Sequence, residues 1–267
     1  MEKLLEIRNL NIEFHDHDIP ERVVNNFNLE LFKGEIVGIV GESGSGKSMT
    51  AMAIAGLLRR HDMEKQGEIL FEGKELLHAS RSEVRKYQGD DIGMIFQEPM
   101  TSLNPVKRIG WQVEESLRIH RPDMSKEERY KRAIESLREV ELDEPKKVYK
   151  QYPHELSGGM RQRVMIAAAM ICEPKLLIAD EPTTALDVTI QLQIVKLLQR
   201  LNREKQTSIL FISHDLSLVK KLCDRIVVMH NGNIVETGNT KEVFYQPEEE
   251  YTKKLIQAIP KLEKLIV

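Results

Sequence analysis

The residues with the clearest chemistry lie at positions 41–48, which read Gly-Glu-Ser-Gly-Ser-Gly-Lys-Ser. They match the spacing G-x-x-x-x-G-K-S, and the residues around them predict a buried strand before the motif and a helix after it, as the motif requires. Glycines allow backbone turns that aim successive amides at phosphate, and the helix adds the positive end of its dipole. Lys47 is therefore expected to reach the β- and γ-phosphates of a nucleotide, and Ser48 to supply an oxygen to Mg²⁺. The alternative is a plain glycine-rich turn. The residues predicted to cradle the nucleotide are Gly41, Glu42, Ser43, Gly44, Ser45, Gly46, Lys47, Ser48 and Met49.

Two carboxylates follow the apolar run Leu176-Leu177-Ile178-Ala179. Acidic side chains at the end of a buried strand are costly unless they have partners or a ligand. Asp180 suits Mg²⁺, and Glu181 suits the activation of an attacking water, an effect of roughly 10²–10⁴ in rate. The alternative is that the pair caps a helix, because Pro182 and two threonines follow.

Two further polar residues follow predicted strands. His214 comes after the apolar run 209–212, at the edge where parallel sheets bind ligands. It is expected to contact the γ-phosphate and to hold Glu181, although a single histidine is more often structural. Gln97 follows Phe96 and is expected to contact Mg²⁺ or the water, and to sense the nucleotide at a hinge. The catalytic candidates are Glu181, His214, Gln97 and Lys47, and the metal candidates are Ser48, Gln97 and Asp180.

A second glycine turn, Ser157-Gly158-Gly159, precedes a helix expected to begin near Met160. Its amides and the helix dipole form a second anion site. Within one chain this turn cannot easily reach a nucleotide held at 41–48. We therefore expect a head-to-tail dimer in which each turn caps the γ-phosphate held by its partner.

The remaining pattern predicts an α/β fold: a P-loop nucleoside triphosphatase core with an antiparallel β subdomain at its edge and an inserted α-helical subdomain. Alternation or continuous β-branched runs predict strands, and apolar spacing of three to four residues predicts helices. Residues 125–128 fit a capping box. We expect a single domain, 1–267, with a core lobe at about 1–103 and 157–245, a helical subdomain at about 104–156 and a tail at 246–267. The predicted strands are 3–14, 23–32, 36–40, 67–73, 92–96, 175–180, 208–213 and 225–229, and the predicted helices are 48–58, 111–140, 160–172, 188–203 and 216–222.

Composition excludes several classes of protein. The net charge of −3 argues against a broad nucleic-acid surface. Apolar runs fall far short of the roughly 20 residues that a membrane span needs, so we expect membrane association only through a partner. Charged residues break up the apolar residues of the stretch 1–6, which is not typical of a signal peptide. Cys172 and Cys223 are interpreted as reduced thiols, and the charges of the tail as a solvated face.

The order of these motifs resembles the ATP-binding cassette (ABC) family. The residues that carry the resemblance are 41–48, Gln97, 156–162, 176–181, 185–187 and His214. The stretches 97–105, 178–189 and 251–255 are similar to the branch that imports oligopeptides, dipeptides and nickel.

The resemblance implies an ATP-hydrolysing subunit on the cytoplasmic face of a bacterial cell membrane. It implies ATP and Mg²⁺ as ligands, with Asp187 among the nucleotide contacts. The implied partners are a second ATPase subunit, which is either a copy of this chain or a sister chain, two permease subunits and an extracytoplasmic substrate-binding protein. A short permease helix would dock in the groove between the core and the helical lobe.

Two departures from the family pattern matter. Many peptide-type members carry a C-terminal cysteine cluster, but no cysteine follows Cys223, so we expect no iron–sulfur cluster. The aromatic residue that stacks on adenine is hard to place, and Phe14 is the nearest candidate. The stretch 15–18, His-Asp-His-Asp, is interpreted as a solvated turn, with metal binding as the alternative.

Two other functions remain as alternatives. A soluble cassette protein acting on ribosomes or DNA usually has two cassettes, or a long insertion, and a basic face. A P-loop kinase or GTPase gives no role to Ser157 or His214. The sequence leaves the cargo open between peptide, nickel and a metal chelate.

Overall fold

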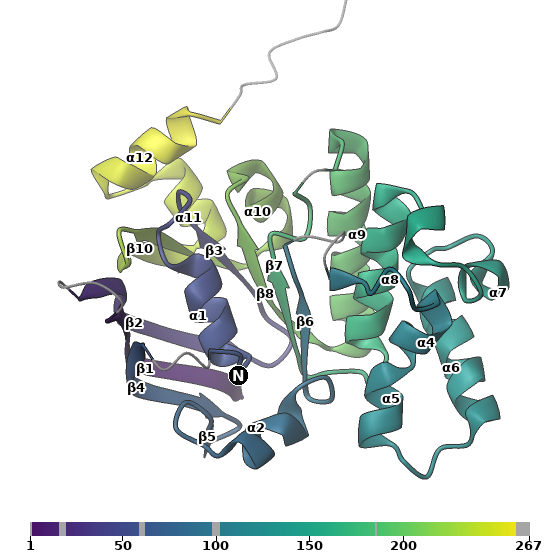
Figure 1. Ribbon diagram of the computed structural model, residues 1–267. Coiled ribbons are helices and arrows are strands. Elements are labelled where there is room, and N and C mark those ends of the chain that lie inside the picture. The colour runs from purple at the N-terminus through teal and green to yellow at the C-terminus, as the bar shows by residue number, and fades with distance from the viewer. Residues whose placement is uncertain (1, 16–19, 59–61, 98–101, 185, 260–267) are drawn as a thin grey trace, which may run out of the picture.

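The structure is a computed structural model that describes residues 2–15, 20–58, 62–97, 102–184 and 186–259 (Figure 1). Its centre is a six-stranded sheet in the order β10-β9-β3-β8-β7-β6. All neighbouring strands are parallel except β9 and β10. The apolar runs predicted to be central strands are buried on both faces, as is typical of parallel sheets. The strands are β3 (Ile36–Val40), β6 (Ile92–Ile95), β7 (Leu176–Asp180), β8 (Ser208–Ser213), β9 (Arg225–His230) and β10 (Asn233–Asn239).

A second, antiparallel sheet packs at one side of the molecule, with the order β2-β1-β4-β5. Alternating polar and apolar residues give each long strand one buried and one solvated face, as the sequence predicted. The two sheets together confirm the predicted fold class. The strands are β1 (Lys3–Phe14), β2 (Glu21–Phe32), β4 (Met63–Phe71) and β5 (Lys74–Glu75).

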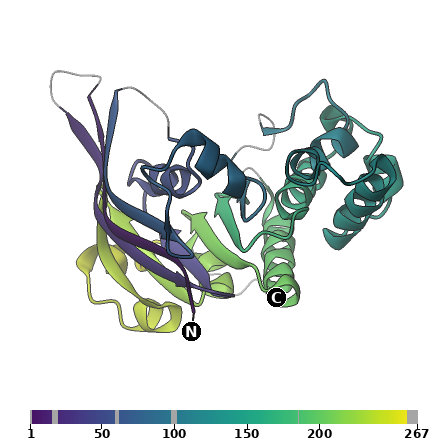
Figure 2. The same cartoon turned by 90° about the horizontal axis from the view of Figure 1, so that it is seen from below.

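The helices cover the central sheet and form a group of their own at the side away from the antiparallel sheet (Figures 1 and 2). That group comprises α4 (Ile109–Val113), α5 (Glu115–His120), α6 (Lys126–Glu139), α7 (Pro145–Val148) and the short 3₁₀ helix η1 (Pro153–Glu155). The others are α1 (Lys47–Ile54), α2 (Arg81–Tyr87), α8 (Gly158–Met170), α9 (Val188–Lys205), α10 (Leu216–Leu222), α11 (Thr240–Tyr245) and α12 (Glu250–Gln257).

The two faces of the central sheet are buried in two different cores. Along β7, Leu177 faces the core that contains α8, and Ile178 faces the core that contains α1 and the antiparallel sheet. Neighbouring side chains on a strand point to opposite faces, so one strand contributes to both cores. Helices α1 and α8 therefore cover opposite faces of the sheet, and each has a glycine-containing turn at its N-terminus.

The long helical stretch predicted at 111–140 is in fact three helices. Pro122 disfavours helical backbone at Arg121, and α5 ends there with φ −129° and ψ 62°. The predicted capping box holds α6: the Ser125 hydroxyl accepts from the Glu128 amide, and the Glu128 carboxylate accepts from the Ser125 amide. The tail, in which Leu and Ile recur at helical spacing, contains α12. Elements without a clear apolar pattern were missed, namely β5, β10, α2, α7 and α11.

Both cysteines are free thiols, and burial raises the pKa of Cys172 to about 11. Within the described ranges no helix is both long and apolar enough to cross a membrane. The turn at 16–18, part of the stretch for which metal binding was the alternative, lies outside the described residues. His15 is described, and its ring lies 3.4 Å from carboxylates of Glu13 and Glu64.

The capping box allows a test of the helical group. Ser125→Ala removes the acceptor for a free helix amide, so the free energy of unfolding should fall by about 1 kcal/mol, measured by urea denaturation. Ser125→Asn keeps a side-chain oxygen at the cap and should stay near the wild-type value. If the free energy of unfolding of Ser125→Ala equals that of the wild type, the cap does not stabilise α6.

Candidate functional site

The glycine loop after β3 forms a cradle because its backbone adopts angles that favour glycine. Gly41, Gly44 and Gly46 have φ values of +154°, +80° and +97°. A Cβ atom on Gly41 would lie 2.2 Å from the Met229 carbonyl oxygen, and one on Gly46 would lie 2.4 Å from the Val23 carbonyl oxygen. The loop is thus pressed between β9 and β2, and α1 begins directly after it.

Lys47 lies inside this loop with only 4% of its surface exposed. Its ammonium donates to the Gly41 carbonyl oxygen at 2.9 Å and to the Glu42 carbonyl oxygen at 2.6 Å. Burial lowers the pKa of Lys47, while the nearby Glu181 and Asp180 partly offset that shift. The loop's own carbonyl groups therefore hold a buried cation that an anionic ligand would stabilise.

Ser48 and Asp180 meet at the carboxyl edge of the sheet. The Ser48 hydroxyl donates to Asp180 Oδ1 at 3.0 Å, and Asp180 is 5% exposed. Burial raises the pKa of Asp180, against the effects of the Ser48 hydroxyl and Lys47. Two oxygen donors in contact fit Mg²⁺, which is usually held by one or two protein oxygens together with phosphate and water. In the described ranges no group of three or more His, Cys, Asp or Glu side chains could hold a metal ion.

Glu181 is held by three side chains that converge on one of its oxygens. Oε2 accepts from Gln97 Nε2 at 3.1 Å and from the Thr184 hydroxyl at 2.9 Å. His214 Nδ1 lies 3.1 Å from the same oxygen, so His214 Nε2, on the other side of the ring, is free to face a ligand. The carboxylate is therefore oriented with Oε1 left for a water molecule.

Glu181 also has an unusual backbone, with φ +45°. Seven other non-glycine residues of the described chain also have positive φ, so this conformation does not by itself mark Glu181 as functional. The alternative that Asp180 and Glu181 cap a helix is wrong. The next helix, α9, is capped by Asp187, whose carboxylate accepts from the Ile190 amide at 3.0 Å.

The Ser157 turn begins α8 two residues earlier than predicted. The exposed Ser157 caps the helix and accepts from the Met160 amide at 3.3 Å. Helices α8 and α1 cover opposite faces of the sheet (Figure 1). Within the described residues of one chain, no hydrogen bond joins Ser157, Gly158 or Gly159 to the cradle.

The remaining candidates are Met49, Phe14 and the first residues of the cradle. Met49 is in the first turn of α1 and packs against the core on that face. Phe14 is the last residue of β1 and pairs with Glu21 of β2. Val23, whose carbonyl oxygen faces Gly46, is also on β2. Glu42, Ser43 and Gly44 are exposed, whereas Ser45 is buried.

Two residues near the site were missed. Thr184 follows Glu181 by three residues, the spacing at which a short turn returns a hydroxyl to a carboxylate, and this signal was present in the sequence. Tyr251 comes from α12, and its hydroxyl accepts from the Glu42 amide at 3.3 Å. No local pattern could connect residues more than 200 positions apart.

Comparison with known proteins agrees with this geometry. The ABC transporter family matches residues 24–184. The oligopeptide transport ATP-binding protein OppD of Escherichia coli is 49% identical over 260 residues, which cover 97% of this chain and 77% of that protein. The dipeptide transport ATP-binding protein DppD of Bacillus subtilis is 46% identical over 264 residues, 98% of this chain and 78% of that protein.

A solved structure shares the fold. It is the dimeric, post-hydrolysis state of the ATP-binding cassette MJ0796 bound to ADP and Pi, with a TM-score of 0.80 and 32% identity. The match covers 89% of this chain and 99% of that one. The glycine cradle, the carboxylates at the end of β7 and these similarities lead to one conclusion: this chain belongs to the ABC transporter family.

Proposed function

We propose that this chain is the ATP-hydrolysing subunit of an importer for oligopeptides or dipeptides, acting at the cytoplasmic face of a bacterial membrane. The observation that carries the proposal is the Glu181 carboxylate, fixed by Gln97, Thr184 and His214 beside the cradle. The names of the two relatives, an oligopeptide and a dipeptide transport protein, favour peptide cargo over nickel or a metal chelate.

The cradle amides and Lys47 bind the phosphates of ATP. Two carbonyl groups of the loop already position the Lys47 ammonium, which would donate to phosphate oxygens from that position. Ser48 and Asp180 would hold Mg²⁺, which neutralises charge on the β- and γ-phosphates when bound. Phe14 is proposed to stack on the adenine, and Met49 to contribute its amide at the start of α1.

Hydrolysis requires a water aligned with the γ-phosphate. Glu181 accepts a proton from that water through Oε1, since its other oxygen is engaged. His214 holds the carboxylate through Nδ1 and presents Nε2 to the γ-phosphate. Gln97 contacts Glu181 and lies at the start of the connection to the helical group, so it can report nucleotide state to that group.

Two copies, or this chain and a sister ATPase, complete each site head to tail. The Ser157 turn of one subunit caps the γ-phosphate held by the other, and Asp187 lies at the same interface. ATP binding closes the dimer and hydrolysis opens it, a two-state switch biased by γ-phosphate contacts. The solved structure of MJ0796, described as dimeric, supports this arrangement.

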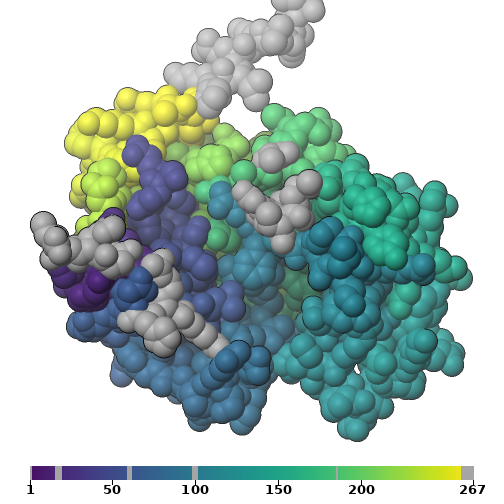
Figure 3. Space-filling model, viewed as in Figure 1, coloured from purple at the N-terminus to yellow at the C-terminus, as the bar shows by residue number. Residues whose placement is uncertain are grey.

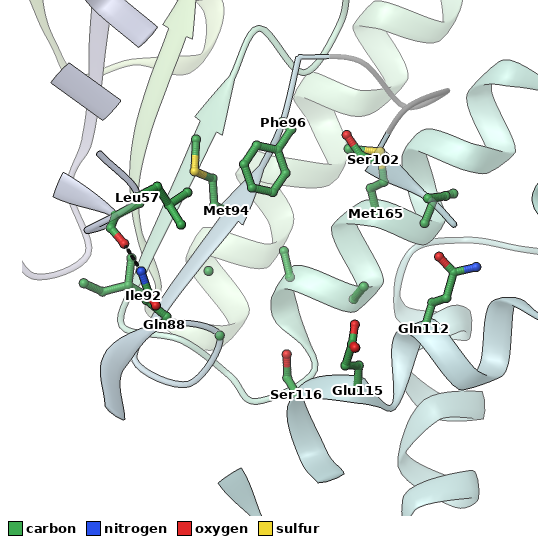
Figure 4. Close-up of a pocket in the computed structure, with 16 residues that line it drawn as sticks. Leu57, Gln88, Ile92, Met94, Phe96, Ser102, Gln112, Glu115, Ser116 and Met165 are labelled. Carbon is green, nitrogen blue, oxygen red and sulfur yellow. Dashed lines mark hydrogen bonds between the residues drawn. The ribbon is translucent and has the colours of Figure 1, made fainter. Parts of the chain in front are cut away.

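The permease is proposed to dock in a groove of about 350 Å³ between the core and the helices from residues 104–156, which we propose form an inserted lobe (Figures 3 and 4). Leu57 and Phe96, which are 40% and 43% exposed, supply apolar surface from the core. Gln112, Glu115 and Ser116 supply polar groups from α4 and α5. A short amphipathic helix fits such a groove. Phe96, which lines the groove, precedes Gln97 in the sequence. An extracytoplasmic binding protein would deliver the peptide to the permease.

Glu181→Gln removes the base but keeps the size of the side chain. We expect ATP binding and ATP-dependent dimerisation to persist while turnover falls by roughly 10²–10⁴. Phosphate release and equilibrium ATP binding measure the two effects, with the exposed Glu127→Gln on α6 as the matched control. Near-normal turnover would reject Glu181 as the base.

Ser157→Ala removes a hydroxyl from the turn that faces the partner's nucleotide. We expect turnover to fall by about tenfold or more, and ATP affinity of the monomer to change less than about twofold. Ser125→Ala also removes a helix cap and controls for lost stability. An equal loss of binding and turnover would contradict a site shared between two subunits.

Leu57→Asp places a charge in the groove and should reduce co-purification with the permease by about tenfold or more. ATP binding by the isolated chain should change little. Ile119→Asp on α5 is the control, because Ile119 is 66% exposed and does not line the groove. Undiminished co-purification of the Leu57→Asp variant with the permease would show that the permease docks at another surface.

A further inference from the structure

The C-terminal helix α12 contacts the phosphate cradle, a contact that catalysis as described above does not use. In Figure 1 α12 lies beside the loop that joins β3 to α1. Tyr251, in the first turn of α12, accepts a hydrogen bond from the Glu42 amide through its hydroxyl, at 3.3 Å. Glu42 is the second residue of the cradle, so the tail contacts the backbone that binds phosphate.

This contact and the Lys47 contact lie on the same peptide group. The peptide between Gly41 and Glu42 presents its carbonyl to the Lys47 ammonium, at 2.9 Å, and its N–H to Tyr251. A trans peptide is planar, with its N–H and C=O pointing in opposite directions. Fixing the N–H therefore fixes the direction of the carbonyl that positions Lys47.

The peptide needs such a restraint because glycine does not supply one. Gly41 has φ +154°, and the absence of a side chain leaves its rotation weakly restricted. The rest of the loop is held from the same side: the Gly232 amide, in the β9–β10 turn, donates to the Ser45 carbonyl oxygen at 3.2 Å. Tyr251 supplies the matching restraint at the start of the loop.

Tyr251 is itself held in place. Its ring packs against His230, the last residue of β9, with centroids 3.9 Å apart and planes tilted by 30°. Glu236 on β10 accepts from the Glu248 and Glu249 amides, at 2.9 and 3.2 Å, just before α12 begins. Thr252 is only 1% exposed. Helix α12 is thus packed against the β9–β10 hairpin, and the Tyr251 hydroxyl contacts the cradle.

We propose that Tyr251 is a positioning residue for ATP binding, which acts by fixing the Gly41–Glu42 peptide and, through its carbonyl, Lys47. The proposal rests on the function proposed above, since it requires that 41–48 binds phosphate. It gives α12 a role at the nucleotide site: movement of the tail would change ATP affinity without any contact between tail and ATP.

The test is Tyr251→Phe in the full chain, which keeps the ring on His230 and removes only the acceptor. Loss of one hydrogen bond should weaken ATP binding by about two- to tenfold. The kcat at saturating ATP and the melting temperature should stay close to wild type. Tyr245→Phe on α11 is the matched control, since Tyr245 is 71% exposed and its hydroxyl has no hydrogen bond within the described part of the chain.

A double-mutant cycle shows whether the effect passes through Lys47. In a Lys47→Ala background the Tyr251→Phe substitution should no longer change ATP affinity, measured by calorimetry. Equal weakening in both backgrounds would assign Tyr251 a purely structural role and overturn the proposal, as would unchanged affinity of the single variant. Failure of the wild-type chain to bind ATP would instead reject the proposed function.

Discussion

A buried cation and a buried carboxylate share the carboxyl edge of the central sheet, and the site is built around this constraint. Lys47 and Asp180 are almost fully buried, and burial opposes the charge on each, lowering the pKa of the first and raising that of the second. Carbonyl groups and one hydroxyl satisfy them in part. Phosphate and Mg²⁺ would supply the missing charges, so the arrangement is one that ligand binding stabilises.

The same parallel sheet separates the two anion-binding turns. Because alternate side chains of β7 face different cores, α1 and α8 lie on opposite faces of the sheet. Within the described residues no hydrogen bond joins the Ser157 turn to the cradle. In the proposed mechanism the cradle and Glu181 prepare the phosphate and the water, and Ser157, exposed at the start of its helix, is left for the nucleotide of a partner subunit. Coupling of ATP hydrolysis to movement between subunits would follow from this division.

Much of the architecture could be predicted from sequence because its signals are local. The buried run at 36–40, the carboxylates after 176–179 and the capping box at Ser125 each depend on a few neighbouring residues. The break at Pro122 had local signals, the proline itself and the capping box at Ser125, but the predicted range ran across it. Elements such as β5 and α7 were missed because brief or charge-rich segments carry a weak periodicity. The contacts of Thr184 and Tyr251 depend on how turns and distant helices meet, and only the fold brings them together.

The division of the site between two subunits is tested most directly by mixing two inactive variants. Lys47→Ala removes the ammonium proposed to bind the β- and γ-phosphates, and Ser157→Arg blocks the facing turn. Each variant should be nearly inactive alone, whereas a mixed dimer contains one intact site, so an equal mixture should recover roughly a quarter of wild-type ATP turnover if subunits pair at random. No recovery in a mixture whose dimerisation is verified by light scattering would show that each chain completes its own site.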